Sequence, residues 1–198
     1  IAGPEGVPVL ETPGDFAMFF ISNEGPDTVL KNFIIKNSYM AALLIGSSPT
    51  ISNVTIVDNI YGIGSLAGAN PDISNSIFWN NINGDLYGCQ ARYSLTTEAG
   101  EGNIYCEPLF ANPNNGDYHL KSERGRYWPE HNIWVLDRIS SPCINAGDPM
   151  SNATEEPVPN GGFINMGAYG GTAYASMSEM PFPDPDYNKD GIINESDL

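Results

Sequence analysis

The chain has 198 residues, with 24 acidic and 8 basic side chains and a formal net charge of −16. This length allows one domain with a sizeable core, plus an appendage. The acidic balance argues against nucleic acid or an anionic membrane as a partner, because basic surfaces bind both. No apolar run approaches the roughly 18 residues of a membrane span. An acidic surface suits cations, although a solvated, soluble surface is its simpler explanation.

Residues 29–81 contain a short repeat. The lines VLKNFIIKN (29–37), TISNVTIVDN (50–59) and DISNSIFWNN (72–81) align at three asparagines that are 21 or 22 residues apart: Asn32, Asn53 and Asn75. A fixed period in this range indicates a solenoid, whose units bury their apolar faces against their neighbours. The repeated residues are β-branched or aromatic and are bounded by Ser, Asn, Gly and Pro, so each unit is expected to form strands and turns.

A bend at each asparagine brings the apolar residues of the three lines into register. The expected inward columns are Leu30, Ile51 and Ile73; Phe33, Val54 and Ser76; and Ile35, Ile56 and Phe78. The opposite parity, Lys31, Ser52 and Ser74, is expected to point at water. Asparagine tolerates the left-handed conformation of such a bend. Asparagines stacked one coil apart, roughly 4.8 Å, can bond to one another, so the repeat predicts an asparagine ladder.

The runs SPTISNVTIVDN (48–59) and NSIFWNN (75–81) resemble those of secreted bacterial β-helix repeat proteins. The closing segments SPCINAGDP (141–149) and NGGFINMGAYGGTAYAS (160–176) resemble the C-terminal end of the same proteins. The resemblance covers about residues 15–180 and implies the right-handed parallel β-helix of the pectin-lyase-like superfamily. It implies less about function, because this fold carries lyases, hydrolases, adhesins and passive scaffolds.

The expected organisation has four parts. They are β-helix coils over 1–120, a C-terminal capping region over 121–180, a Pro-rich linker over 181–185 and a calcium-loop tail over 186–198. Phe16–Ile21 belongs to an earlier, less regular coil, and second strands are expected at 41–46, 61–66 and 85–90. Three glycines there are expected to relieve backbone crowding: Gly62, Gly64 and Gly88. Three aromatic residues are expected to help a loop-rich cap cover the open end of the stack: Trp128, Trp134 and Tyr169.

The three cysteines, Cys89, Cys106 and Cys143, do not form a complete disulfide framework. Cys89 and Cys106 either pair across a coil or, at least as readily, remain as buried thiols. The chain opens at Ile1 without a methionine or a leader and stops one residue after a metal-loop pattern. Both ends are therefore interpreted as cut, and the chain as the C-terminal part of a longer protein.

The clearest chemical signal is DYNKDGIINESD at 186–197, which follows a calcium-loop pattern. Ca²⁺ takes six to eight oxygen ligands, which suits short oxygen-bearing side chains at alternate positions. The expected ligands are Asp186, Asn188, Asp190, the Ile192 carbonyl, Asn194 directly or through water, and Asp197. Gly191 permits the sharp turn. Aspartate at the last position and asparagine at 194 resemble one calcium repeat of a type I dockerin, and a complete dockerin, with two such repeats, binds a cohesin.

The coils lack the charged clusters that polysaccharide lyases of this fold use, since only Lys31 and Lys36 are basic there. One weak carboxylate pair is Asp27 and Asp72, which both follow proline and are expected to stack two coils apart with Thr50 between them. That spacing, roughly 9.6 Å, is near the upper end for an inverting glycosidase. Ordinary turn chemistry explains both aspartates more simply. His119 and His131 are interpreted as surface or structural residues.

Two hypotheses follow. In the first, the chain is a secreted, non-catalytic β-helix scaffold or a carbohydrate or surface-interaction region with a calcium-dependent C-terminal module. In the second, it is the C-terminal part of a polysaccharide lyase or glycoside hydrolase whose catalytic coils lie upstream. The expected partners are a polysaccharide or cell-surface glycan and, through a complete dockerin, a cohesin-like protein.

Overall fold

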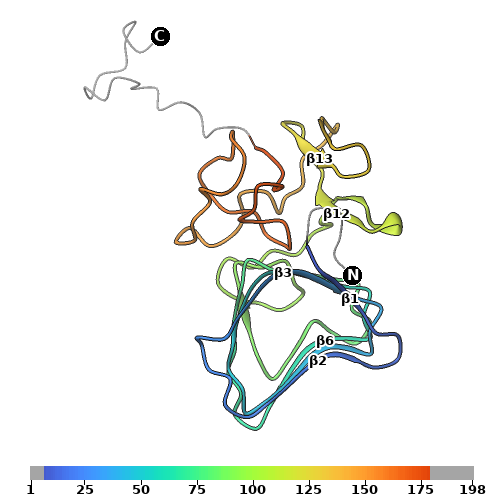
Figure 1. The fold of residues 1–198 in the computed structure, drawn as a ribbon. Helices are drawn as coiled ribbons and strands as arrows, with labels where there is room; N and C mark the ends of the chain where they lie inside the picture. Colours follow the sequence, from blue (N-terminus) through green and yellow to red (C-terminus); the bar gives the residue numbers. More distant parts are fainter. Residues whose placement is uncertain (1–6, 179–198) are drawn as a thin grey trace, which may run out of the picture.

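The computed structural model describes residues 7–178 and is almost entirely β. Two parallel sheets wind into a solenoid, seen in section as stacked triangles in Figure 1. The first has the order β1-β3-β5-β7-β10, with β8 also paired to β5, and the second has the order β2-β4-β6-β9. Their strands are β1 (Val9–Glu11), β2 (Phe16–Ile21), β3 (Val29–Lys36), β4 (Met40–Ile45), β5 (Thr50–Val57), β6 (Tyr61–Leu66), β7 (Asp72–Ser74), β8 (Ile77–Trp79), β9 (Leu86–Tyr87) and β10 (Ala91–Arg92). The all-β solenoid class is confirmed.

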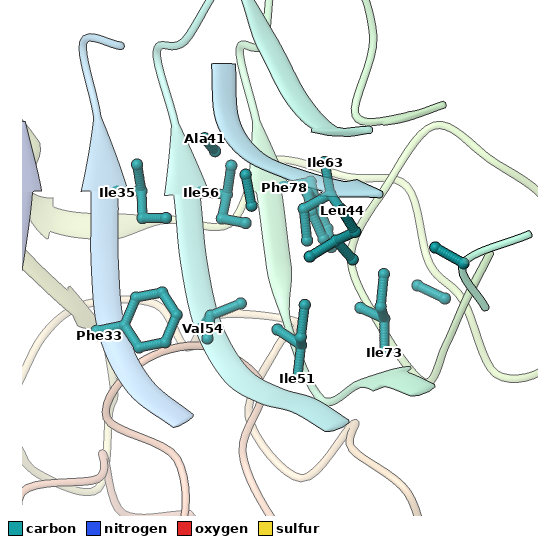
Figure 2. Packing of buried hydrophobic residues seen from close by; sticks show 13 residues of the cluster. Phe33, Ile35, Ala41, Leu44, Ile51, Val54, Ile56, Ile63, Ile73 and Phe78 are labelled. Atoms are coloured by element: carbon teal, nitrogen blue, oxygen red, sulfur yellow. The ribbon is translucent and has the colours of Figure 1, made fainter. Parts of the chain in front are cut away.

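The register of the first sheet follows the repeat in the sequence. Leu30 pairs with Ile51 and Ile51 with Ile73, and the next inward columns are Phe33 with Val54, and Ile35 with Ile56 and Phe78. Leu30 packs against the core cluster, and the other side chains of these columns point into the solenoid (Figure 2). Four of them, Ile51, Ile56, Ile73 and Phe78, are at most 2% exposed. Each such side chain contributes about 1.5–3 kcal/mol when it is removed from water. Stacking of like residues therefore stabilises the coils.

The three repeated asparagines take the predicted left-handed conformation, with φ of 56°, 49° and 52° at Asn32, Asn53 and Asn75. The predicted ladder among them is wrong. Asn32 Nδ2 donates to the carbonyls of Ala168 (3.0 Å) and Gly170 (2.9 Å). The asparagines therefore hold the C-terminal region, residues 110–178, instead of one another.

The next two asparagines bind neighbouring parts of that region. Asn53 Nδ2 donates to the carbonyls of Asn165 (2.9 Å) and Gly167 (3.3 Å). Asn75 donates to Ser151 Oγ and accepts from the Asp148 N–H at 2.7 Å. The column thus spans three coils and fastens residues 148–170 along the side of the sheet.

A side-chain ladder does exist, at the bend between the two sheets. Asn59 Oδ1 accepts the Ser38 N–H at 2.9 Å, and Asn59 Nδ2 donates to Asn81 Oδ1 at 3.1 Å. Asn81 Nδ2 donates to Asp85 Oδ1 at 2.9 Å, which extends the network toward the last coil. These groups link successive coils at a position that carries Ser in one coil and Asn in the next two.

Beyond the asparagine bend, the first sheet is buried on both faces. Ile34 pairs with Thr55, Thr55 with Ile77, and Ile77 bridges to Leu95; all four are at most 1% exposed. They form a second apolar cluster with residues of the C-terminal region such as Met166. A strand buried on both faces carries a continuous apolar run. The runs FIIK, VTIV and SIFW have this character, a pattern from which a cover over this face could have been inferred.

The C-terminal region is loop-rich, as expected, but it lies along the outer side of the first sheet and not over the end of the stack (Figure 1). It contains two antiparallel pairs. They are formed by β11 (Phe110–Asn112) with β12 (Asp117–Leu120), and by β13 (Arg126–Trp128) with β14 (Ile133–Val135); a 3-10 turn, η1 (Pro113–Asn115), precedes β12. The change from parallel to antiparallel strand pairing shows that the repeat has ended before β11.

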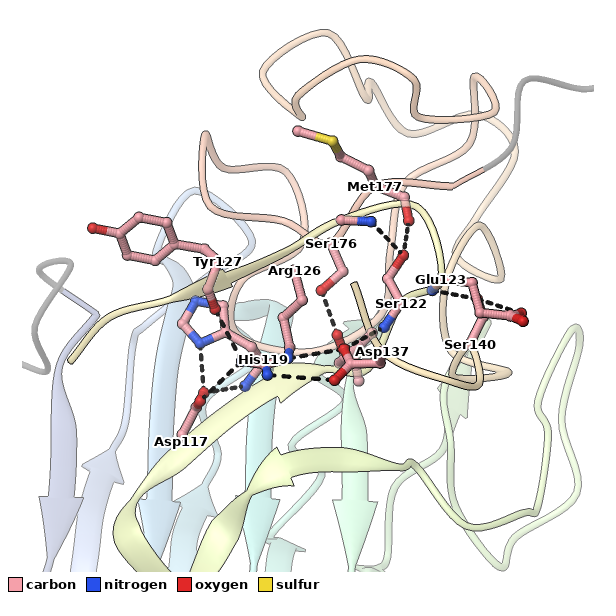
Figure 3. A network of polar contacts seen from close by, with 12 residues as sticks. Asp117, His119, Ser122, Glu123, Arg126, Tyr127, Asp137, Ser140, Ser176 and Met177 are labelled. Carbon is pink, nitrogen blue, oxygen red and sulfur yellow. Dashed lines mark hydrogen bonds and ion pairs between the residues drawn. The ribbon is translucent and has the colours of Figure 1, made fainter. Parts of the chain in front are cut away.

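A polar network holds this region together (Figure 3). Arg126 Nε donates to Asp137 at 2.9 Å, and Arg126 Nη1 donates to Asp117 at 3.3 Å. Asp117 Oδ1 lies 2.7 Å from His119 Nδ1. The His119 ring is fully buried and stacks on Tyr169 with 3.6 Å between ring centroids. Since His119 and Tyr169 are both buried, their structural interpretation is confirmed.

A buried carboxylate bridges two parts of the segment that the asparagines hold. Glu156 is 3% exposed, and its Oε1 accepts the N–H groups of Asn165 and Gly171, both at 2.8 Å. Among the described residues, Oε2 has no hydrogen-bond partner. Burial raises the pKa of Glu156 to about 7, although the two backbone N–H groups act to lower it. The attachment therefore contains a titratable group.

The two glycines of β6 confirm the expected close approach of neighbouring coils. A Cβ at Gly62 would collide with the carbonyl oxygen of Asp85 in the next coil. One at Gly64 would meet Met40 Sδ at 3.2 Å. Gly88 has a left-handed φ of 69°, and a Cβ at this position would lie 2.4 Å from the Ser65 carbonyl oxygen. Side chains at these positions would push the coils apart.

All three cysteines are free. The possible pairing of Cys89 with Cys106 is wrong, because Cys89 packs against the solenoid core and Cys106 against the second cluster. Burial raises the pKa of Cys89 to about 11 and that of Cys143 to about 12. The described thiols are therefore protonated at neutral pH.

Candidate functional site

A polar groove of about 430 Å³ lies between the outer face of the first sheet and the C-terminal region. Its floor is formed by outward residues of β3, β5, β7 and β10, on the N-terminal side of the asparagine bends. Its wall is formed by residues 151–155 and 170–171, which the asparagine column holds in place. The groove therefore exists only because the C-terminal region docks on the side of the solenoid.

The floor is a straight column that crosses the strands. By register, Lys31 pairs with Ser52, Ser52 with Ser74, and Ser74 with Arg92. The column crosses three inter-strand steps, so it is ~14 Å long and runs along the solenoid axis. Thr50 and Asp72 form a shorter parallel column beside it. A cationic side chain thus stands at each end, with hydroxyl groups between them.

Three residues of this column, Lys31, Ser52 and Ser74, were predicted to face water, and the prediction holds for only part of them. Lys31 is exposed and Ser52 is half-buried, but Ser74 is only 6% exposed. The wall approaches the floor at this level, where Asn75 binds Ser151 and Asp148. Ser74 is therefore covered by the C-terminal region, which has no repeat and which the strand pattern could not place.

The charges in the groove are nearly balanced. Arg92 donates to Asp72 at 3.3 Å and forms a close ion pair with Asp148. Partial burial acts to lower the pKa of Arg92, but the two carboxylates outweigh it and raise the pKa above its ordinary value. Glu155 contributes a further carboxylate to the wall, and the exposed Lys31 a further cation to the floor. The site offers hydrogen-bonding groups without a strong net charge.

The predicted carboxylate pair does not form. Asp72 pairs with Thr50, but Thr50 pairs with Val29, so Asp27 lies two residues before the column. Both aspartates follow a proline, but the two prolines do not hold equivalent places in their coils. The residue that aligns with Asp72 and Thr50 is Val29, not Asp27. Asp72 is instead engaged with Arg92.

The two tryptophans of the C-terminal region lie apart from the groove. Trp128 is 36% and Trp134 39% exposed, and they pack edge-to-face against His131 and Tyr127 respectively. Both belong to the β13–β14 hairpin and pack on residues of that hairpin and its turn. The expected role of Trp128 and Trp134 in covering the open end of the stack is therefore not observed.

The predicted calcium ligands Asp186, Asn188, Asp190, Ile192, Asn194 and Asp197 lie outside the described residues, as do the linker and the tail around them. Within residues 7–178, no group of three or more His, Cys, Asp or Glu side chains is placed to hold a metal ion. In the same range, no helix has the length and apolarity to span a membrane. The calcium site stays a prediction.

Comparison with protein families gives one match over most of the solenoid. The family model described as "Disaggregatase related" matches residues 17–147, which extend from β2 to the residue before Asp148. Comparisons with curated proteins and with solved structures gave no match. The matched range includes the whole floor of the groove and excludes its whole wall.

Proposed function

The chain belongs to the disaggregatase-related family, and on this basis we propose that it is a non-catalytic β-helix scaffold whose groove binds polysaccharide at a cell surface. The observation that carries the proposal is the column of Lys31, Ser52, Ser74 and Arg92 beside a fixed wall. A site that runs ~14 Å across evenly spaced strands suits an extended polymer better than a compact metabolite.

The groups along the groove suit sugar hydroxyls. Ser52 supplies a hydroxyl that can donate and accept, and Asn152 in the wall adds an amide. The Thr50 hydroxyl donates to the Pro26 carbonyl at 2.9 Å and is left as an acceptor. The site is held rigidly, because stacked strands set the floor and the asparagine column sets the wall. A preorganised site loses less side-chain entropy when the polymer binds.

The charge of the chain favours a neutral polymer. The net charge of −16 repels a polyanion over the whole surface. Inside the groove, Asp72 and Asp148 neutralise Arg92, which leaves Lys31 as the exposed cation of the floor column. A neutral glycan meets no such repulsion, so its binding should depend little on salt.

Affinity electrophoresis and calorimetry against soluble neutral glucans and xylan, with pectate and alginate alongside, test this proposal. Ser52→Trp should fill the floor and weaken binding of a neutral glycan about tenfold or more. Glu130→Trp, at an exposed turn outside the groove, should leave binding unchanged. Equal binding by both variants would remove the groove as the site. Preference for pectate or alginate would refute the neutral class while keeping the groove.

The second candidate function is the C-terminal part of a polysaccharide lyase or glycoside hydrolase with catalytic coils upstream. It is favoured by the dockerin-like pattern at 186–197, since such modules usually accompany carbohydrate-active enzymes. We expect no turnover from residues 1–198 incubated with pectate, alginate and neutral glucans when unsaturated and reducing ends are measured. Turnover that disappears in Asp27→Asn or Asp72→Asn would establish the enzyme instead.

We also propose that the protein is secreted and that its tail binds Ca²⁺ through Asp186, Asn188, Asp190, Ile192, Asn194 and Asp197. The support is the alternation of oxygen-bearing residues around Gly191. A complete dockerin formed from this repeat and a second one would bind a cohesin-like partner and attach the scaffold to an assembly.

A further inference from the structure

The second sheet has an uncharged outer surface. Its strands β2, β4, β6 and β9 read FAMFFI, MAALLI, YGIGSL and LY, and contain no acidic or basic residue. This is unusual in a chain with 32 charged side chains, 24 acidic and 8 basic. The sheet lies on the side of the solenoid away from the C-terminal region (Figure 1), so the groove and this surface are separate.

The register divides the sheet into an inner and an outer face. Met18, Ala42, Ile63 and Leu86 pair along the inner face and pack on the core. Their neighbours Phe19, Leu43, Gly64 and Tyr87 pair along the outer face. Phe19 is 49% and Tyr87 67% exposed. Gly64 is buried, but Phe19, Leu43 and Tyr87 are apolar or aromatic although solvent reaches them.

A file of aromatic rings continues this face along the solenoid axis. Phe16 and Tyr39 lie 5.6 Å apart between ring centroids, and Tyr39 and Tyr61 lie 5.5 Å apart. Phe16 also contacts Phe19 at 5.8 Å, which joins the file to the outer column. Tyr39 is 41% exposed. We call this surface the aromatic face: Phe16, Phe19, Tyr39, Leu43, Tyr61 and Tyr87.

Three features indicate what covers it. A contiguous exposed apolar surface on a soluble protein marks an interaction site. Tyrosine combines a large apolar ring with a polar tip, which suits a ligand that is apolar on its flat side and hydroxylated at its edge. A second copy of the chain would bring another charge of −16 toward the same side, which opposes association.

We propose that the aromatic face binds the C–H groups of neutral polysaccharide chains packed in an insoluble surface. The rings lie on successive coils at a nearly constant spacing and meet edge to face, at 67° and 65° between their planes. They therefore offer both ring faces and ring edges to several C–H groups along one polymer direction. The absence of charge in the four strands avoids the cost of desolvating ionised groups against a neutral solid. This site is independent of the groove.

Sedimentation with microcrystalline cellulose, chitin and an insoluble β-1,3-glucan tests the proposal. Phe19→Ser/Tyr39→Ser should lower the affinity for the best-bound solid about tenfold or more. Leu136→Ser, which is 74% exposed on the C-terminal region, should have no effect. The groove variant Ser52→Trp should still bind the solid, which separates this site from the groove.

Analytical ultracentrifugation of the parent and the double variant decides between a solid and a second copy. The expected result is a monomer for both proteins. A dimer of the parent that dissociates in the double variant would show that the face is a self-interface and would overturn the proposal. Absence of binding to all three solids, or equal binding by parent and double variant, would overturn it as well. Circular dichroism confirms that each variant is folded.

Discussion

Substitution of Asn53 tests how the C-terminal region is held. In the parent, its side chain is 6% exposed and donates to two carbonyls, of Asn165 and Gly167. Asn53→Ala leaves these acceptors without their donor, at a cost of about 1–3 kcal/mol. Alanine must also adopt a φ of 49°, which adds about 1 kcal/mol. The expected loss of unfolding free energy is therefore about 2–4 kcal/mol.

Asn80→Ala is the matched control. Asn80 has a φ of 56°, but it is exposed and makes a single long contact, 3.4 Å, with Asp58. Its substitution should cost only the backbone part, about 1 kcal/mol. The difference between the two variants isolates the bonds to the C-terminal region from the conformational strain.

Urea denaturation followed by tryptophan fluorescence measures both losses, because Trp128 and Trp134 lie in the C-terminal region and Trp79 in the solenoid. A chain of this size should lose roughly 2–4 °C of Tm per kcal/mol, so thermal unfolding gives an independent reading. If Asn53→Ala costs no more than Asn80→Ala, the amide bonds do not hold the region and the groove wall is attached by apolar packing alone.

Further outcomes are expected at the buried acid, the tail and the coil contacts. Glu156 has a pKa of about 7 in the folded protein against an ordinary 4.5, so its contribution to stability is present below pH 4.5 and is lost as the pH rises through 7. Between pH 4.5 and 8, the unfolding free energy of Glu156→Gln should therefore rise relative to that of the parent by up to about 3 kcal/mol. Parallel pH profiles of the two proteins would disprove this. Calorimetric titration should show Ca²⁺ binding that Asp186→Ala and Asp190→Ala abolish and with which Mg²⁺ competes poorly, whereas heat that survives both substitutions would place calcium elsewhere. Gly62→Ala should cost about 1–3 kcal/mol because its Cβ meets a main-chain carbonyl, while Gly25→Ala, with open space around it, should stay within about 0.5 kcal/mol.

The repeat in the sequence determined the solenoid. Leu30, Ile51 and Ile73 occupy one column because coils of nearly equal length bring the same position of each repeat to the same place. The left-handed bends at the asparagines could be read for the same reason, since few other residues tolerate that conformation. Local pattern and period suffice for these features, which involve only neighbouring coils.

Only the tertiary structure decided what the asparagines bind. Asn32 reaches residues more than 130 positions away in the chain, and no period connects it to them. The groove depends on the same long-range contact, so Lys31 and Arg92 could not be recognised as the ends of one site from their own surroundings. The apolar run through Ile34 is compatible with a covered outer face, but nothing in it identifies the covering segment. A side-chain amide at a left-handed bend can hydrogen-bond a neighbouring asparagine or a loop carbonyl equally well. Which partner it binds depends on whether a distant segment of the chain packs beside it, as residues 165–170 do here.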